Sequence, residues 1–170
     1  MIKQEWKVTI RKFEFSDVPQ KVKWINDSRV NRYLHYTLPL EIEKTEAWFF
    51  ANKDRTDRYD AVIECDNIPV GLIGLLQIDF SKWCAEYYIA IGEPNFFGRG
   101  IAAKASTELF KYAFGTLKLN SVYLYTECDN ISAIHLYEKF GFKKAIIRKD
   151  YYSDGSDAIL MIKDMKGEVR

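Results

Sequence analysis

The sequence predicts one mixed α/β (α+β) domain over residues 1–170, with its elements in the order β-α-α-β-β-β-α-β-α-β-β. Two kinds of apolar periodicity predict this class. Several short segments alternate apolar and polar residues, as half-buried strands do, and others repeat apolar residues every third or fourth position, as helices do. The length is sufficient for one domain with a buried core, and no repeat, low-complexity tract or linker divides the chain.

In the first half of the chain, helices are predicted where an apolar face follows a capping residue. Ser16-Asp17 begins one such helix, whose apolar face runs to about Asp27. The stretch between Ser28 and Leu40, rich in Arg, Tyr and His, is predicted to be irregular, and residues 66–69 to form a turn between two strands. The predicted elements are a strand at 7–12, helices at 16–27 and 41–53, and strands at 59–65 and 70–79.

In the second half, glycines mark where helices begin and end. Gly98-Arg99-Gly100 separates a β-type run from a helix, and Gly141 follows a short helix at the position where left-handed backbone is needed. Ser153-Asp154-Gly155 is predicted to be the turn of an antiparallel pair. The predicted elements are strands at 84–91, 121–128, 142–150 and 156–163, and helices at 101–113 and 130–139.

Composition excludes several classes of protein. The formal net charge of +1 and the lack of a long basic run argue against a nucleic-acid partner. Three cysteines (Cys65, Cys84, Cys128), each in a predicted strand, are far apart and have no histidine at ligand spacing, which indicates a reduced protein without a bound metal. The N-terminus lacks the apolar core of a signal peptide, and no run is long enough to span a membrane. We therefore expect a cytoplasmic protein that does not bind membranes.

Two segments carry the functional signal. The first is Gly98-Arg99-Gly100 between a strand and a helix, where unpaired backbone N–H groups can hold a pyrophosphate. The second, residues 129–142, contains Asn-x-x-Ala-x-x-x-Tyr-x-x-x-Gly-Phe. Together they resemble the GCN5-related N-acetyltransferase (GNAT) family, especially its ribosomal-protein and spermidine acetyltransferase branch. The resemblance departs at Asn95, where the family has Gln or Arg.

The resemblance implies a splayed, mostly antiparallel mixed sheet flanked by helices, with acetyl-CoA entering where the sheet splays. It also implies that the strand near Ile89 to Ile91 pairs with the pantetheine arm and donates an N–H to the thioester carbonyl. The implied cofactor-binding residues are Ile89, Ala90, Ile91, Phe97, Gly98, Arg99, Gly100, Ile101, Ala102, Asn130 and Tyr137.

Tyr137 matches the tyrosine that the family uses as the general acid for the departing CoA thiolate. It lies two helical turns after Asn130, so both share one face, whereas His135 points away. A substrate ammonium must also lose a proton before it attacks, and Glu86 is the first candidate for the base. Glu127, Asp79 or an ordered water are the alternatives.

The resemblance places the acceptor pocket at the first two helices and the loop between them. Aromatic and cationic side chains there favour an amino sugar or another small amine over a polyamine, since few acidic residues are present. The predicted acceptor residues are Trp24, Asn26, Arg29, Tyr33, His35, Tyr88 and Glu127, with Arg32 and Tyr36 in the same loop.

The sequence therefore predicts an N-acetyltransferase that moves an acetyl group from acetyl-CoA to a primary amine by direct attack on the thioester. No cysteine is predicted to form an acyl-enzyme. The alternatives are a protein N-terminal acetyltransferase, with a peptide N-terminus as acceptor, and a non-catalytic acyl-CoA sensor. Dimers are common among the proteins it resembles, so a homodimer is a further expectation.

Overall fold

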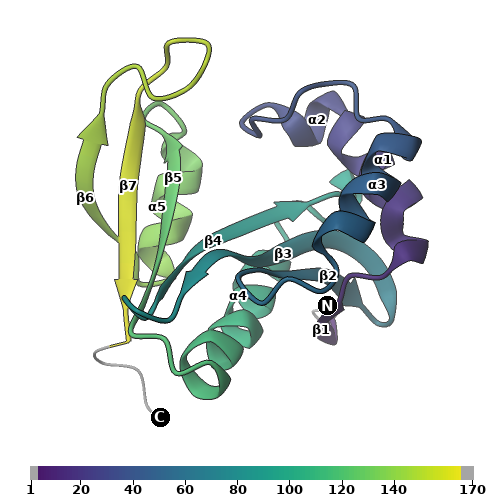
Figure 1. Cartoon of the computed structure of the whole chain (residues 1–170), viewed down its shortest axis with the longest axis horizontal. Helices are drawn as coiled ribbons and strands as arrows, with labels where there is room; N and C mark the ends of the chain where they lie inside the picture. Colours follow the sequence, from purple (N-terminus) through teal and green to yellow (C-terminus); the bar gives the residue numbers. More distant parts are fainter. Residues whose placement is uncertain (1–3, 166–170) are drawn as a thin grey trace. The chain divides into compact units, whose positions relative to one another are not determined.

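A computed structural model describes residues 4–165 of the chain, and the described residues form seven strands in one mixed sheet flanked by helices (Figure 1). Hydrogen-bonded neighbours follow the order β1-β2-β3-β4-β5-β7-β6. Strand β5 is parallel to β4, whereas the β1/β2, β5/β7 and β6/β7 pairs are antiparallel. The predicted fold class is thus confirmed.

The chain divides into two compact units, and each is described by itself. The N-terminal unit comprises Met1–Gly74 and Ile89–Leu109, and the C-terminal unit comprises Leu75–Tyr88 and Phe110–Arg170. The division falls within two strands, β3 (Ile68–Asp79) and β4 (Cys84–Ile91), and close to the end of helix α4 (Ile101–Phe110).

In the N-terminal unit, three helices lie between the first two strands in the chain. The core contains the apolar faces of these elements, including Val18, Ile25 and Ile63, each fully buried. The elements are β1 (Val8–Lys12), the 3-10 turn η1 (Phe15–Asp17), α1 (Val18–Asn26), α2 (Ser28–Asn31), α3 (Ile42–Asn52), β2 (Tyr59–Cys65) and the 3-10 turn η2 (Pro94–Phe96).

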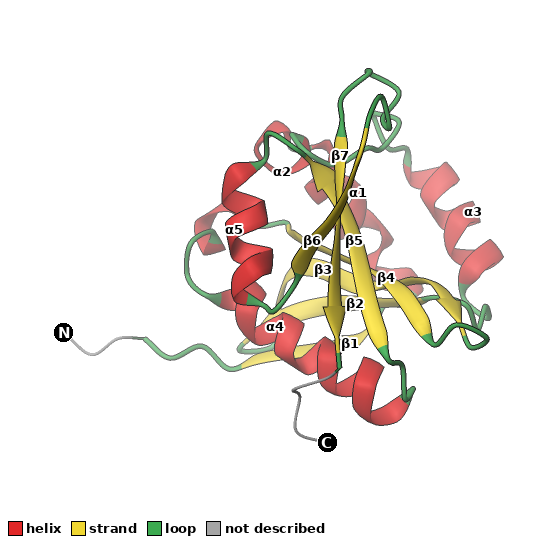
Figure 2. Ribbon diagram, turned by 90° about the vertical axis from the view of Figure 1, so that its left-hand side faces the viewer, coloured by secondary structure: helices red, strands yellow, loops and turns green. Residues whose placement is uncertain are grey.

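In the C-terminal unit, strand β5 separates a buried face from a partly exposed one. Val122, Leu124 and Thr126 are buried, while the alternate residues, Tyr123 and Tyr125 among them, remain partly exposed. Figure 2 shows β5, β6 and β7 together with helix α5. The remaining elements are the π-helical segment η3 (Lys111–Thr116), β5 (Ser121–Glu127), α5 (Ile131–Lys139), β6 (Lys143–Arg148) and β7 (Ala158–Asp164).

The structure corrects three local predictions. Residues 28–31 form the short helix α2, because the Asp27 carboxylate accepts a hydrogen bond from the Arg29 N–H and caps it. The turn before β3 contains only Asp66 and Asn67, both with positive φ (49° and 66°), so residues 68 and 69 belong to the strand. Cys128 lies in a turn just after β5 rather than in the strand.

Most predicted boundaries agree with the structure within one or two residues. Strands β2 and β4 have the predicted bounds, and α5 ends before Gly141, whose φ is +94°. Within residues 4–165, no helix has both the length and the apolar character that a membrane span requires. Residues 1–3, on which the signal-peptide prediction partly rests, lie outside the described range.

Candidate active site

The junction between β4 and α4, in the N-terminal unit, is built on two glycines with left-handed backbone. Gly98 has φ +69° and Gly100 has φ +76°, a region that other residues adopt at a cost. Apart from the adjacent residues of the chain, no atom of residues 4–165 lies within 4 Å of where a Cβ would stand at either position, and the segment is exposed. The backbone N–H groups before α4 are therefore accessible to an anion, as such a helix start favours.

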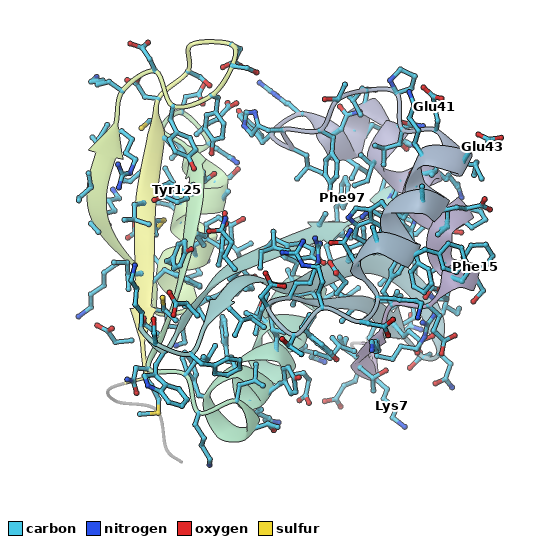
Figure 3. The ribbon with its side chains drawn as sticks, in the orientation of Figure 1. Lys7, Phe15, Glu41, Glu43, Phe97 and Tyr125 are labelled. Carbon is cyan, nitrogen blue, oxygen red and sulfur yellow. The ribbon has the colours of Figure 1, made fainter. Side chains whose placement is uncertain are left out.

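The residues beside this junction have distinct environments. Ile101 is buried and anchors the first turn of α4, whereas Phe97, labelled in Figure 3, is 43% exposed. The Arg99 guanidinium carbon lies 6.0 Å from the centre of the Phe96 ring, so its charge stays near the junction. Ala102 is partly buried.

The last residues of β4 approach β3 closely. A Cβ on Gly71 would stand 2.5 Å from the Ala90 carbonyl oxygen, so only glycine permits this approach. The backbone of Ile89 to Ile91 is therefore held by packing against a glycine, and these three residues are partly buried. Their contact with a pantetheine arm stays a prediction.

In the C-terminal unit, Glu86 is a half-buried carboxylate on β4. Within the part of the chain that the structure describes, it makes no hydrogen bond and no ion pair, and burial alone raises its pKa above the usual value for glutamate. The parallel register places it opposite Tyr123 of β5. A carboxylate with a raised pKa and no partner is suited to accept a proton or to attract a cation.

The charge of Glu86 acts on several tyrosines of the same unit. Burial, and then the nearby Glu86, raise the pKa of Tyr123 to about 12. Burial also raises the pKa of Tyr151 and of Tyr152, with a smaller contribution from Glu86. These phenols remain protonated near neutral pH, so they can donate hydrogen bonds.

Tyr137 of α5 lies among other aromatic rings of the C-terminal unit. Its ring makes edge contacts with Tyr87 at 6.1 Å and with Phe142 at 6.0 Å between centroids. Burial raises the pKa of Tyr137 to about 12, so the hydroxyl retains its proton. His135 on the same helix is exposed, in agreement with the predicted separation of their faces.

Asn130 stands at the N-terminal cap position of α5 and is 9% exposed. Its side-chain nitrogen donates to the Thr126 hydroxyl at 3.4 Å, and its backbone carbonyl accepts from the Ile134 N–H at 3.0 Å. These contacts give Asn130 a structural role at the entry to α5, and its predicted contact with the cofactor stays a prediction.

Three residues predicted to bind the acceptor use their polar groups within the N-terminal unit. Trp24 is only 2% exposed and donates from Nε1 to the Glu93 carboxylate at 2.8 Å. The Asn26 side chain hydrogen-bonds both the backbone N–H and the backbone carbonyl of Leu40. Arg29 forms a bidentate ion pair with Asp27. Their acceptor roles remain predictions that these contacts do not support.

The other predicted acceptor residues have some exposed surface. Tyr33 is partly exposed and has the Arg32 guanidinium 5.2 Å from its ring centre, and His35 is exposed. In the C-terminal unit, Tyr88 and Glu127 are partly exposed.

Asp79, an alternative base, has a different environment. It accepts hydrogen bonds from the backbone N–H groups of Ser81 and Lys82 and from the Ser81 hydroxyl, which lower its pKa. A carboxylate bound in a turn is a weak base, so the contacts favour Glu86 over Asp79.

Sequence reasoning missed the grouping of tyrosines around Glu86. The alternation of Tyr123 and Tyr125 along β5 was a sequence signal that both rings lie on one face of the strand. The sequence of the loop after β6 did not indicate that Tyr151 stacks on Tyr125. Among residues 4–165, no group of three His, Cys, Asp or Glu side chains is placed to hold a metal ion.

The fold agrees with comparisons against known proteins. The profile of the acetyltransferase (GNAT) domain matches residues 7–143. The spermidine N(1)-acetyltransferase of Escherichia coli K12 is 32% identical over 137 residues, which cover 79% of this chain and 72% of that protein. The chain belongs to the GNAT acetyltransferase family and is an N-acetyltransferase.

Two further matches define its relatives. An uncharacterized N-acetyltransferase, p20 of Bacillus licheniformis, is 25% identical over 150 residues, covering 85% of this chain and 84% of that protein. The crystal structure of spermidine N-acetyltransferase from Vibrio cholerae, in complex with CoA and spermine, has a TM-score of 0.87. At 24% identity, over 94% of this chain and 96% of that one, it supports the fold.

Proposed function

We propose that this enzyme transfers the acetyl group of acetyl-CoA to a primary aliphatic amine, with Glu86 as the base and Tyr137 as the acid. The observation that carries the proposal is the half-buried Glu86 carboxylate, which has no hydrogen bond or ion pair among the described residues. A protonated amine is the ligand that such a group attracts, and it is also the group that must lose a proton.

The residues of the N-terminal unit fit the cofactor. Gly98 and Gly100 leave space beside the backbone at the start of a ten-residue helix, and Arg99 supplies a positive charge nearby. These features suit the pyrophosphate of CoA. When bound, acetyl-CoA supplies the acetyl thioester that the amine attacks.

The residues of the C-terminal unit supply the proton transfers. Glu86 takes a proton from the acceptor ammonium, and its raised pKa makes it a stronger base than an exposed glutamate. Tyr137 keeps its proton because burial raises its pKa to about 12, and it donates that proton to the leaving thiolate. The surrounding aromatic rings fix its orientation.

For the acceptor, the chemistry at Glu86 favours a positively charged aliphatic amine, and the E. coli relative is a spermidine acetyltransferase. The sequence favoured an amino sugar or another small amine over a polyamine, from residues around Trp24 and Arg29 whose polar groups are hydrogen-bonded within the protein. Amino sugars and peptide N-termini therefore serve as the alternatives. A cytoplasmic location and a homodimer stay predictions.

The test is release of CoA thiol from acetyl-CoA in the presence of spermidine, butylamine, glucosamine or a short peptide with a free N-terminus. We expect turnover with the aliphatic amines and little with the sugar or peptide. Acetylation of glucosamine alone would restore the acceptor predicted from the sequence. Absence of turnover with every amine, while acetyl-CoA still binds, would contradict the proposed function.

A further inference from the structure

Four tyrosines form a continuous series of rings that begins beside Glu86, all in the C-terminal unit. Tyr123 lies opposite Glu86 in the parallel register and contacts the Tyr125 ring at 6.1 Å. Tyr125, labelled in Figure 3, stacks on Tyr151 at 4.7 Å with only 15° between the ring planes. Tyr151 then contacts Tyr152 at 5.0 Å. Aromatic faces in such a series suit a hydrocarbon chain that carries positive charge.

The loop between β6 and β7 holds the second pair of these rings in place. Asp157 accepts from the Lys149 ammonium and from the Asp150 N–H, both at 2.9 Å. Within the loop, the Gly155 N–H donates to the Tyr152 carbonyl at 2.9 Å. Tyr151 is nevertheless 46% exposed, so its ring is accessible to a ligand.

The series of rings ends near a second carboxylate. Glu127 lies on the same face of β5 as Tyr123 and Tyr125, four residues beyond Tyr123, which is about 13 Å along a strand. Its charge contributes to the raised pKa of Tyr152, after burial and the neighbouring Tyr151. One carboxylate thus stands near each end of the series.

One of these rings, that of Tyr125, lies within cation–π distance of a cationic side chain of the protein. The Arg148 guanidinium carbon lies 5.9 Å from the centre of the Tyr125 ring. Lys149, the next residue, is instead paired with Asp157. The rings therefore offer cation-binding faces beside a loop whose lysine charge is balanced.

We propose that Tyr123, Tyr125 and Tyr151 form a subsite that binds the methylene chain of a linear acceptor with two or more positive nitrogens, between Glu86 and Glu127. The inference rests on the proposed function, because Glu86 receives the reacting amine. Glu127 and Tyr151 then determine specificity: they recognise the part of the acceptor that does not react. A monoamine reaches Glu86 but not Glu127.

The test compares spermidine with butylamine as acceptors for the Tyr151→Ala and Glu127→Gln variants of the full chain. We expect each variant to raise KM for spermidine roughly tenfold, the range for a lost cation–π or charge contact, with kcat little changed. KM for butylamine should stay within about twofold of the unaltered protein. Tyr151→Phe keeps the ring and should keep the spermidine KM.

Phe80→Ala is the matched control, because Phe80 is an aromatic residue of the same unit with similar exposure, 45%, that contacts Trp83 rather than the tyrosines. Equal losses for spermidine and butylamine, or an unchanged spermidine KM in both Tyr151→Ala and Glu127→Gln, would overturn the subsite. Turnover of neither amine by the unaltered protein would instead contradict the proposed function, so the two failures are distinguishable.

Discussion

Among the described residues, several carboxylates of the N-terminal unit form ion pairs with arginines, whereas one half-buried carboxylate of the C-terminal unit does not. In the N-terminal unit, Arg11 bridges Asp17 at 2.8 Å and Glu64 at 3.2 Å, and Arg58 pairs with Asp60 at 2.7 Å. In the C-terminal unit, Glu86 is half buried and, within residues 4–165, has neither a hydrogen bond nor an ion pair. Arginines thus hold these three carboxylates of the N-terminal unit, while the C-terminal unit keeps Glu86 available.

The difference separates a structural use of charge from a chemical one. An Arg–carboxylate pair fixes the position of two elements and has little capacity left for a ligand. A half-buried carboxylate without a partner costs stability, and proteins retain such groups mainly where a ligand or a reaction uses them. The contrast points to the C-terminal unit as the source of the acid–base chemistry.

The largest effect is expected from Tyr137→Phe, which removes a hydroxyl and keeps the ring contacts with Tyr87 and Phe142. Loss of a general acid typically costs about 10²-fold or more in rate, so kcat should fall by at least that factor. Binding of CoA, measured by calorimetry, should change little. Tyr112→Phe removes a hydroxyl elsewhere in the unit and should keep kcat; equal kcat in both variants would remove Tyr137 from the mechanism.

A smaller effect, on stability, tests how tightly the N-terminal unit is packed. A Cβ at Gly92 would stand 2.2 Å from Cγ of Trp24. Trp24 is only 2% exposed, and its indole N–H is hydrogen-bonded to the Glu93 carboxylate. Gly92→Ala should therefore lower the free energy of unfolding by about 3 kcal/mol, measured by urea denaturation.

Gly115→Ala is the control, because Gly115 lies in the helical segment η3 and a Cβ there would meet no atom of the other described segments within 4 Å. It should leave stability unchanged or raise it by about 0.5–1 kcal/mol. An unfolding free energy unaltered by Gly92→Ala would show that the Trp24 region can relax, and the contrast between the units would weaken.

Much of the fold was predictable because it depends on local signals. The alternation in β5 and the glycine after α5 determine elements whose bounds depend on neighbouring residues, and both agree with the structure. The helix α2 was missed because a single capping contact from Asp27 stabilises its four residues, too few to show a periodicity.

The candidate site was only partly predictable. The family resemblance predicted roles for Glu86 and Tyr137, and these roles stay predictions. The stacking of Tyr151 on Tyr125 gave no local signal, because it joins residues 26 positions apart and depends on a loop in which Asp157 accepts a hydrogen bond from the Asp150 N–H. Trp24 appeared suited to an acceptor because it is aromatic and near a polar loop. Its burial against Gly92 comes from tertiary packing, which composition does not encode.

The central claim is that Glu86 is the base, and the pH dependence of kcat/KM for the unaltered protein and Glu86→Gln tests it most directly. Burial raises the pKa of Glu86, and a base must be deprotonated, so activity should fall as pH decreases through that raised value. Glu86→Gln should lose about 10²-fold in kcat/KM at neutral pH together with this acidic limb. A variant that keeps both its activity and the same acidic limb would contradict the account.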